Sequence, residues 1–169
     1  MPARRTQLQQ ELAQNKPFTS ASDEGSVAIL RTADVLRRAF TRVLEPHDIT
    51  LAQYNVLRIL RGAGVDGLPT LKVAGRLIEA APGITLMMNR LVRRRWVRRR
   101  RDRRDRRCVM CFLTDQGRQL LHELDAPFRA AGDAALAALA VPDQQRLIGM
   151  LEVVRRDHAA VPNAKENSR

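Results

Sequence analysis

The most concentrated chemistry in this sequence is a run of arginines between Arg90 and Arg107. The window of 18 residues holds 12 Arg and 2 Asp, a net charge of +10, whereas the whole chain of 169 residues carries +12. Guanidinium groups form planar, paired hydrogen bonds with phosphates and with guanine edges. A GC-rich genome would explain the total number of arginines but not their concentration here, and Leu91, Trp96 and Val97 interrupt the run as in a folded segment. We therefore interpret the run as a nucleic-acid-binding surface.

Two cysteines follow the run, and Cys108 and Cys111 have the C-x-x-C spacing that can indicate redox or metal chemistry. The segment is predicted to be a strand, in which residues three apart point to opposite faces. There is no second pair and no nearby His, so we expect both thiols to pack within the fold. A redox sensor that acts through Cys108 is the alternative, because Arg106 and Arg107 would favour a thiolate there.

The pattern of histidines and glycines does not indicate an enzyme. His47, His122 and His158 are far apart in the sequence, and His122-Glu123 lacks the second His of a zinc protease helix. The sequence has neither a glycine-rich phosphate loop nor a nucleophile elbow. We therefore predict no catalytic residues, no metal site and no cofactor.

Length and composition indicate one globular domain. The hydrophobic fraction is 44% and the aromatic fraction 4%, so aliphatic side chains must fill the core. No apolar run reaches the roughly 18 residues of a membrane span. The polar residues 1–15 do not resemble a secretory signal, so we expect a cytoplasmic protein with no membrane partner.

Hydrophobic residues at spacings of three and four predict a mainly helical chain. We expect residues 1–20 to form a flexible arm or an extra helix, residues 21–158 to form the domain, and residues 159–169 to form a tail. The expected helices cover residues 22–44, 51–61, 71–78, 82–95, 115–131, 133–140 and 141–158, with a loop at 63–69. Thr50 and Gln53 form a capping box for the second helix. Thr70 is expected to cap the third helix, and Pro82 to lie in the first turn of the fourth.

The fourth helix has an apolar inner face and a polar outer face. Ile84, Met87, Met88 and Leu91 recur at the helical period and should face the core. The outer face then carries Thr85, Leu86, Asn89, Arg90 and Arg93. Asn favours adenine and Arg favours guanine among base edges, so this helix is predicted to read DNA.

Two strands after the reading helix predict a basic hairpin. They cover residues 96–101 and 107–113, joined by a polar turn. A helix-turn-helix followed by such a hairpin is a winged helix, here within residues 51–113, and arginines at its tip would enter the minor groove. The wing arginines expected to contact DNA are Arg103, Arg104, Arg106 and Arg107.

These motifs together resemble the MarR family of bacterial transcriptional regulators over about Val27 to Val154. Residues 102–107 (DRRDRR) followed by 113–117 (LTDQG) are similar to the family's wing signature, D-x-x-D-x-R and L-T-x-x-G. Residues 51–57 (LAQYNVL) resemble its second helix, and 82–85 (PGIT) with 89–91 (NRL) resemble its recognition helix.

The resemblance implies an obligate homodimer, joined by its first and last two helices, on a pseudo-palindromic operator in double-stranded DNA. Its recognition helices would lie about 34 Å apart. It also implies that Asp105 braces Arg107 by an ion pair and that an arginine near Arg104 or Arg106 enters the minor groove. A bacterial cytoplasmic regulator of this kind is associated with the nucleoid when bound.

The resemblance further implies regulation, most simply repression, that a small phenolic or anionic ligand relieves. Candidate pocket residues are His47, Tyr54 and Arg58. The alternative for these three is that Tyr54 belongs to the core and the other two are solvated.

Two residues depart from the family pattern. Leu86 stands where members commonly carry Arg, and it can touch a thymine methyl but cannot hydrogen-bond a base. Arg95 stands where Gly is common, so it must adopt the left-handed backbone at about 1 kcal/mol or the helix must run on. We therefore expect DNA binding that is less base-specific than is typical of the family and strongly electrostatic. A basic nucleic-acid-binding or nucleoid-associated protein without an effector is the alternative function.

Overall fold

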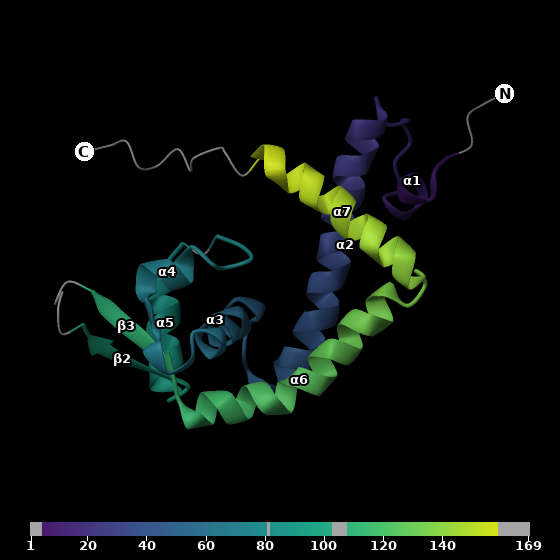
Figure 1. Cartoon of the computed structure of the whole chain (residues 1–169). Coiled ribbons are helices and arrows are strands. Elements are labelled where there is room, and N and C mark those ends of the chain that lie inside the picture. Colours follow the sequence, from purple (N-terminus) through teal and green to yellow (C-terminus); the bar gives the residue numbers. More distant parts are fainter. Residues whose placement is uncertain (1–4, 81, 103–107, 159–169) are drawn as a thin grey trace, which may run out of the picture. The chain divides into compact units, whose positions relative to one another are not determined.

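A computed structural model of the chain describes residues 5–80, 82–102 and 108–158 (Figure 1). The contacts group the chain into two compact units, Met1–Gly132 and Asp133–Arg169. The elements follow in chain order, with η marking a 3-10 helix. They are α1 (Gln7–Glu11), α2 (Ala21–Leu44), η1 (Glu45–His47), α3 (Leu51–Gly62), η2 (Gly64–Asp66), β1 (Leu68–Pro69), α4 (Thr70–Ala74), α5 (Ile84–Arg93), β2 (Val97–Arg101), β3 (Val109–Leu113), α6 (Asp115–Leu136) and α7 (Val141–His158).

Residues 5–20, expected as an arm or an extra helix, contain the short helix α1. Thr6 and Gln9 form a capping box, and the buried Gln9 side chain donates to the Lys16 carbonyl oxygen at 3.1 Å. These bonds fix the segment before α2, whose amide at Asp23 donates to the Ser20 hydroxyl oxygen at 3.1 Å. The helix therefore begins at Ala21, close to the predicted start.

The apolar stripe of α2 is only partly covered within one chain. Leu36, Phe40 and Val43 are half-buried, as expected for core-facing positions. Leu30 belongs to the same predicted stripe but is 71% exposed. The N-terminal half of α2 therefore presents apolar surface to the outside of a single chain.

The capping box predicted for the helix after residue 50 is confirmed. The Gln53 amide donates to Thr50 Oγ1 at 3.2 Å, and the Thr50 amide donates to Gln53 Oε1 at 3.0 Å. These two bonds satisfy amides at the start of α3 that have no partner within the helix. Leu57 and Leu60 are then buried against the core.

The prediction for the next helix was wrong in its length and its cap. α4 ends at Ala74 with Gly75 as its C-cap, and Pro69 rather than Thr70 is its N-cap. The Thr70 hydroxyl instead donates to the Val109 carbonyl oxygen at 3.3 Å, in a distant strand. A local pattern cannot reveal this long-range partner.

Helix α5 is shorter than predicted at both ends. Pro82 lies before it, and Gly83 is its N-cap in a left-handed conformation at φ 89°. At the other end Arg95 adopts φ 60°, the first of the two alternatives expected for it. The Trp96 amide donates to the Leu91 carbonyl and the Arg95 amide to that of Val92, the hydrogen-bond pair that normally ends a helix at Gly.

The wing is a three-stranded antiparallel sheet in the order β1-β3-β2. β1 was predicted as loop, and it pairs Leu68 with Cys111. In the β2–β3 hairpin, Arg99 lies opposite Cys111 and Arg98 opposite Phe112, so the two arginines occupy opposite faces. Figure 1 shows this hairpin beside α5.

The L-T-x-x-G motif forms the junction from the wing to α6. Thr114 Oγ1 accepts from the Gly117 amide at 3.1 Å, which confirms its predicted capping role, and donates to the Arg95 carbonyl oxygen at 2.6 Å. A Cβ at Gly117 would stand 2.7 Å from Leu113 Cδ1 and closer still to the Trp96 carbonyl oxygen. Only glycine fits this approach, which explains its place in the motif.

The long helix α6 closes the core of the first unit. Its predicted apolar stripe is confirmed, since Leu120, Leu121 and Leu124 are buried and the Phe128 ring stacks on Phe40 with a centroid separation of 4.3 Å. Pro127 lies inside the helix, which continues to Leu136 rather than ending near residue 131.

The second unit consists of the end of α6 and the helix α7, whose bounds match the prediction. Its apolar residues Ile148, Met150, Val153 and Val154 are exposed. None of the helices in the described part of the chain combines the length and the apolar character that a membrane span requires.

Candidate nucleic-acid interface

The outer face of α5 gathers the five residues predicted for it. Thr85, Leu86, Arg90 and Arg93 are exposed and Asn89 is half-buried, while Met88 and Leu91 on the inner face are fully buried. The Leu86 side chain is 54% exposed, so no neighbour in the described part of the chain covers it. The face therefore presents an amide, a hydroxyl, two guanidinium groups and one apolar side chain to a partner.

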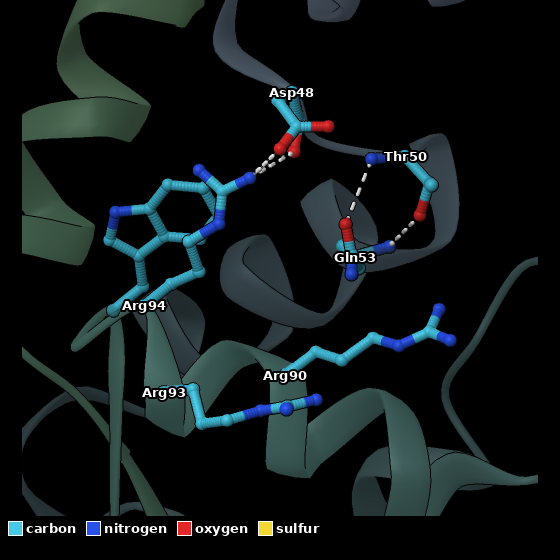
Figure 2. Close-up of a pocket in the computed structure, with 7 residues that line it drawn as sticks. Asp48, Thr50, Gln53, Arg90, Arg93 and Arg94 are labelled. Atoms are coloured by element: carbon cyan, nitrogen blue, oxygen red, sulfur yellow. Dashed lines mark hydrogen bonds and ion pairs between the residues drawn. The ribbon is translucent and has the colours of Figure 1, made fainter.

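A cavity of about 390 Å³ lies between the C-terminal half of α5 and the start of α3. Figure 2 shows Arg90 and Arg93 extending from α5 on the same side as the Thr50–Gln53 turn. Within the described residues, neither guanidinium has an ion-pair partner, so both are available to an anionic group. A phosphate oxygen is the anion that such paired donors bind best in a nucleic acid.

The third arginine of this cavity is already occupied. Arg94 forms an ion pair with the Asp48 carboxylate and donates to the Asp48 carbonyl oxygen at 3.2 Å (Figure 2). Its guanidinium carbon also lies 5.0 Å from the centroid of the Trp96 ring. Asp48 has a left-handed backbone at φ 50°, which turns it toward the helix. Arg94 therefore ties α5 to the η1–α3 turn.

The wing contributes a residue that the sequence did not single out. Arg99, exposed on β2, donates a hydrogen bond to Asn89 Oδ1 on the outer face of α5. Its neighbours Arg98 and Arg100 lie over the Phe112 ring instead, with guanidinium carbons 4.2 Å and 5.2 Å from its centroid. Four consecutive arginines look equivalent in the sequence, and the strand register alone distinguishes them.

The wing-tip residues predicted to contact DNA lie outside the described residues. These are Arg103, Arg104, Arg106 and Arg107, with the bracing residue Asp105. Their roles remain predictions.

The candidate ligand-pocket residues occupy different settings. Tyr54 is buried, and its ring packs against Phe128 with a centroid separation of 4.3 Å. Burial raises the pKa of its hydroxyl, and the Arg58 guanidinium lies 5.9 Å from the ring centroid. His47 is half-buried in η1. The structure thus brings Tyr54 and Arg58 together, with Tyr54 in the core.

The two cysteines differ in burial. Cys111 is fully buried, its sulfur lies 3.3 Å from Thr70 Oγ1, and burial raises the pKa of its thiol. Cys108 is half-buried with its sulfur 3.9 Å from that of Met110. Both thiols are free. In the described residues no three His, Cys, Asp or Glu side chains gather in a way that would suit a metal ion.

Comparison with known proteins agrees with this geometry. No protein-family model matches the chain. The chain is 31% identical over 128 residues to the HTH-type transcriptional regulator TtmR of Methylorubrum extorquens, a match that covers 76% of this chain and only 64% of TtmR. It is 34% identical to a MarR transcription factor from Planctomyces limnophilus, with a TM-score of 0.63, over 81% of this chain and 99% of that structure. The chain belongs to the MarR family.

The fold of MarR proteins is present in this chain throughout its winged helix. The DNA complex of MepR from Staphylococcus aureus has a TM-score of 0.72 at 21% identity, over 78% of this chain and 96% of that one. The predicted fold class, a mainly helical winged helix with a small β wing, is confirmed. In this MarR chain the two departures from the family pattern, Leu86 and Arg95, lie on the exposed face of α5 and at its end.

Proposed function

We propose that this MarR-type DNA-binding transcriptional regulator is a homodimeric repressor of a pseudo-palindromic operator, and that it works in the bacterial cytoplasm. The observation that carries the proposal is the outer face of α5, where exposed arginines without ion-pair partners flank a half-buried Asn89. A helix with such a face fits the major groove, where its amide reaches base edges and its arginines reach phosphates. Arg90 and Arg93 hold the backbone, and Asn89 reads a base.

The wing extends the interface beyond the major groove. β2 carries four arginines in succession, and the expected tip residues add four more. Arginine is favoured in a narrow minor groove because the potential there is most negative. This part of the interface supplies affinity for any DNA sequence, so we expect the affinity for DNA to fall steeply as the salt concentration rises.

A second copy of the chain would cover the apolar surface that one chain leaves open. Leu30 on α2 is 71% exposed and Met150 on α7 is 61% exposed. Helices with exposed apolar side chains of this kind are typical of subunit interfaces. Two copies related by a twofold axis would present two α5 helices to two half-sites.

A small anionic or phenolic ligand is proposed to release the operator. The site of this ligand is not assigned beyond the residues His47, Tyr54 and Arg58 named from the sequence. Ligand screening by thermal shift, with and without operator DNA, tests this part of the proposal.

The first test is binding of the purified chain to the DNA upstream of its own gene and to random duplex across a salt series. A preferred site that survives competitor DNA, occupied by a dimer, supports the proposal. Equal affinity for both duplexes, falling steeply with salt, would instead support a non-specific nucleic-acid-binding protein, a function that the exposed Leu86 would suit because it donates no hydrogen bond.

A pair of variants tests the reading role of α5. Asn89→Ala should reduce the ratio of specific to random binding by roughly tenfold, since one side chain reading a base contributes discrimination of that order. Arg93→Ala is the matched control on the same face and should weaken both kinds of binding alike. Equal losses on both duplexes for Asn89→Ala would contradict its reading role.

A further inference from the structure

The contact between Arg99 and Asn89 joins the wing to the reading face of α5. Arg99 projects from the helix-facing side of β2, opposite Cys111, and donates to Asn89 Oδ1. Arginine has five N–H donors and no acceptor, so Asn89 can meet it only through its carbonyl oxygen. The orientation of the Asn89 amide follows from this chemistry.

The contact changes what Asn89 offers to a base. A free asparagine reads adenine through two bonds, one accepted by its oxygen from N6 and one donated by its nitrogen to N7. When Arg99 takes one of the two lone pairs of this oxygen, the oxygen is a poorer acceptor for adenine N6, and the pair presents mainly donors: the Asn89 amide hydrogens and the remaining guanidinium hydrogens. Guanine presents two acceptors in the major groove, O6 and N7, whereas adenine adds a donor and cytosine presents a donor.

We infer that Arg99 is a specificity-determining residue, which by holding Asn89 Oδ1 directs this face of α5 to guanine instead of adenine. The inference rests on the proposed function, since it concerns the base that the same helix reads. It assigns to a wing strand a part in major-groove recognition, in addition to the minor-groove role proposed for the hairpin.

The position of Arg99 in the fold supports a fixed pair. Its strand is held by the buried Val97 at one end and by pairing with β3 along its length. Asn89 is half-buried on a helix whose neighbouring Met88 and Leu91 are fully buried. Both partners therefore project from elements that the core keeps in place, which preorganises the pair before DNA binds.

The test is a competition assay with the full-length protein and duplexes selected from a randomised library. Asn89→Ala first identifies the operator position at which base preference is lost. At that base pair the four alternatives are then compared for the wild-type protein, Arg99→Ala, Arg99→Lys and Arg98→Ala. Thermal unfolding of each variant confirms that it is folded.

We expect the wild-type protein to prefer guanine at this position by about tenfold over adenine. Arg99→Ala frees Asn89 Oδ1 and should reverse the ranking to favour adenine. Arg99→Lys retains a donor and should keep the guanine preference. Arg98→Ala removes the same charge from the opposite face of β2, so it should lower affinity for every duplex without changing the ranking.

The outcomes separate this inference from the proposed function. A wild-type protein with no preferred duplex would overturn both. A preferred duplex whose ranking at the mapped position is the same in Arg99→Ala, or one that shows adenine in both proteins, would overturn the inference and leave the regulator intact. Loss of ranking in Arg98→Ala as well would show that charge rather than the Asn89 contact sets the preference.

Discussion

Adjacent arginines in this chain have different roles because they have different partners. Arg94 is held by Asp48 and lies over Trp96, whereas Arg90 and Arg93 are without ion-pair partners in the described residues. Within one turn at the end of the helix, one arginine thus stabilises the fold and two are free to bind. The residue type alone predicts basic character, and the contacts decide where each charge acts.

This difference predicts that substitutions at two neighbouring residues affect different quantities, DNA affinity in one case and stability in the other. Arg93→Ala should weaken binding to all duplexes and reduce the slope of log affinity against log salt by about 1, because one phosphate contact is lost. Arg94→Ala should instead lower the free energy of unfolding by about 0.5–1 kcal/mol, since its ion pair is exposed and its ring contact is modest. Fluorescence anisotropy across salt and thermal unfolding measure the two quantities. An equal change of salt slope in both variants would contradict the assignment.

At the scale of elements, the junction between α5 and β2 stores strain at Arg95. Its φ of 60° is a conformation in which a Cβ is unfavourable. Arg95→Gly should therefore raise the free energy of unfolding by about 1 kcal/mol, the usual penalty for this backbone. Chemical denaturation measures it. Arg95→Ala removes the same charge but keeps the Cβ, so any gain should be absent in that control.

Most elements could be predicted because their signals are local. The Thr50–Gln53 capping box and the apolar spacing of α6 each lie within a few residues, and both are confirmed. α4 was predicted too long, since Gly75 ends it and Thr70 bonds to β3 rather than to the helix. β1 was missed because two residues form a strand only against a partner far along the chain.

The candidate site likewise has features that local sequence signals predict and features that they do not. The outer face of α5 followed from the helical period, and the structure gathers all five of its residues. The contact from Arg99 to Asn89 could not be predicted, because it depends on which of four arginines faces the helix. Side chains alternate between the two faces of β2, so the register of the strand decides which arginine faces the helix. The buried Cys111 and Leu113 on β3 set this register.

At the scale of the whole molecule, an ion pair links α3 to α6 within the first unit. Arg61 donates two hydrogen bonds to the Asp125 carboxylate, at 2.7 Å and 2.9 Å. These bonds hold the pKa of Asp125 below its ordinary value of 3.8. A carboxylate with a lowered pKa stabilises the folded state above its unfolded pKa, and this contribution is lost as the pH falls through the folded pKa.

The pair therefore predicts a pH-dependent difference in stability. The wild-type protein should exceed Asp125→Asn in free energy of unfolding at neutral pH, and the difference should shrink once the pH falls below 3.8. Denaturation at a series of pH values measures it. Asp66→Asn, at an exposed position of η2, removes the same charge without an ion pair to α6 and is the matched control. A gap that persists at low pH would point to packing instead of charge.

The exposed apolar side chains of α7 predict the assembly state. Met150→Asp places a charge where a second copy is proposed to pack, so it should shift the protein toward monomer in sedimentation velocity runs and weaken operator binding. Gln145→Asp adds the same charge at an exposed polar position of the same helix and should leave the dimer intact. A dimer unaffected by Met150→Asp would place the interface elsewhere.

The four arginines of β2 also bear on how this family member tolerates changes of length. Deleting any one residue of the Arg98–Arg101 run yields the same shortened sequence, and arginines still fill the positions opposite Phe112, Cys111 and Met110. The shortening then falls at the hairpin end, away from α5. A repeated residue thus makes the strand insensitive to single-codon losses, so wing length is free to drift in evolution while the guanidinium beside the recognition helix is kept.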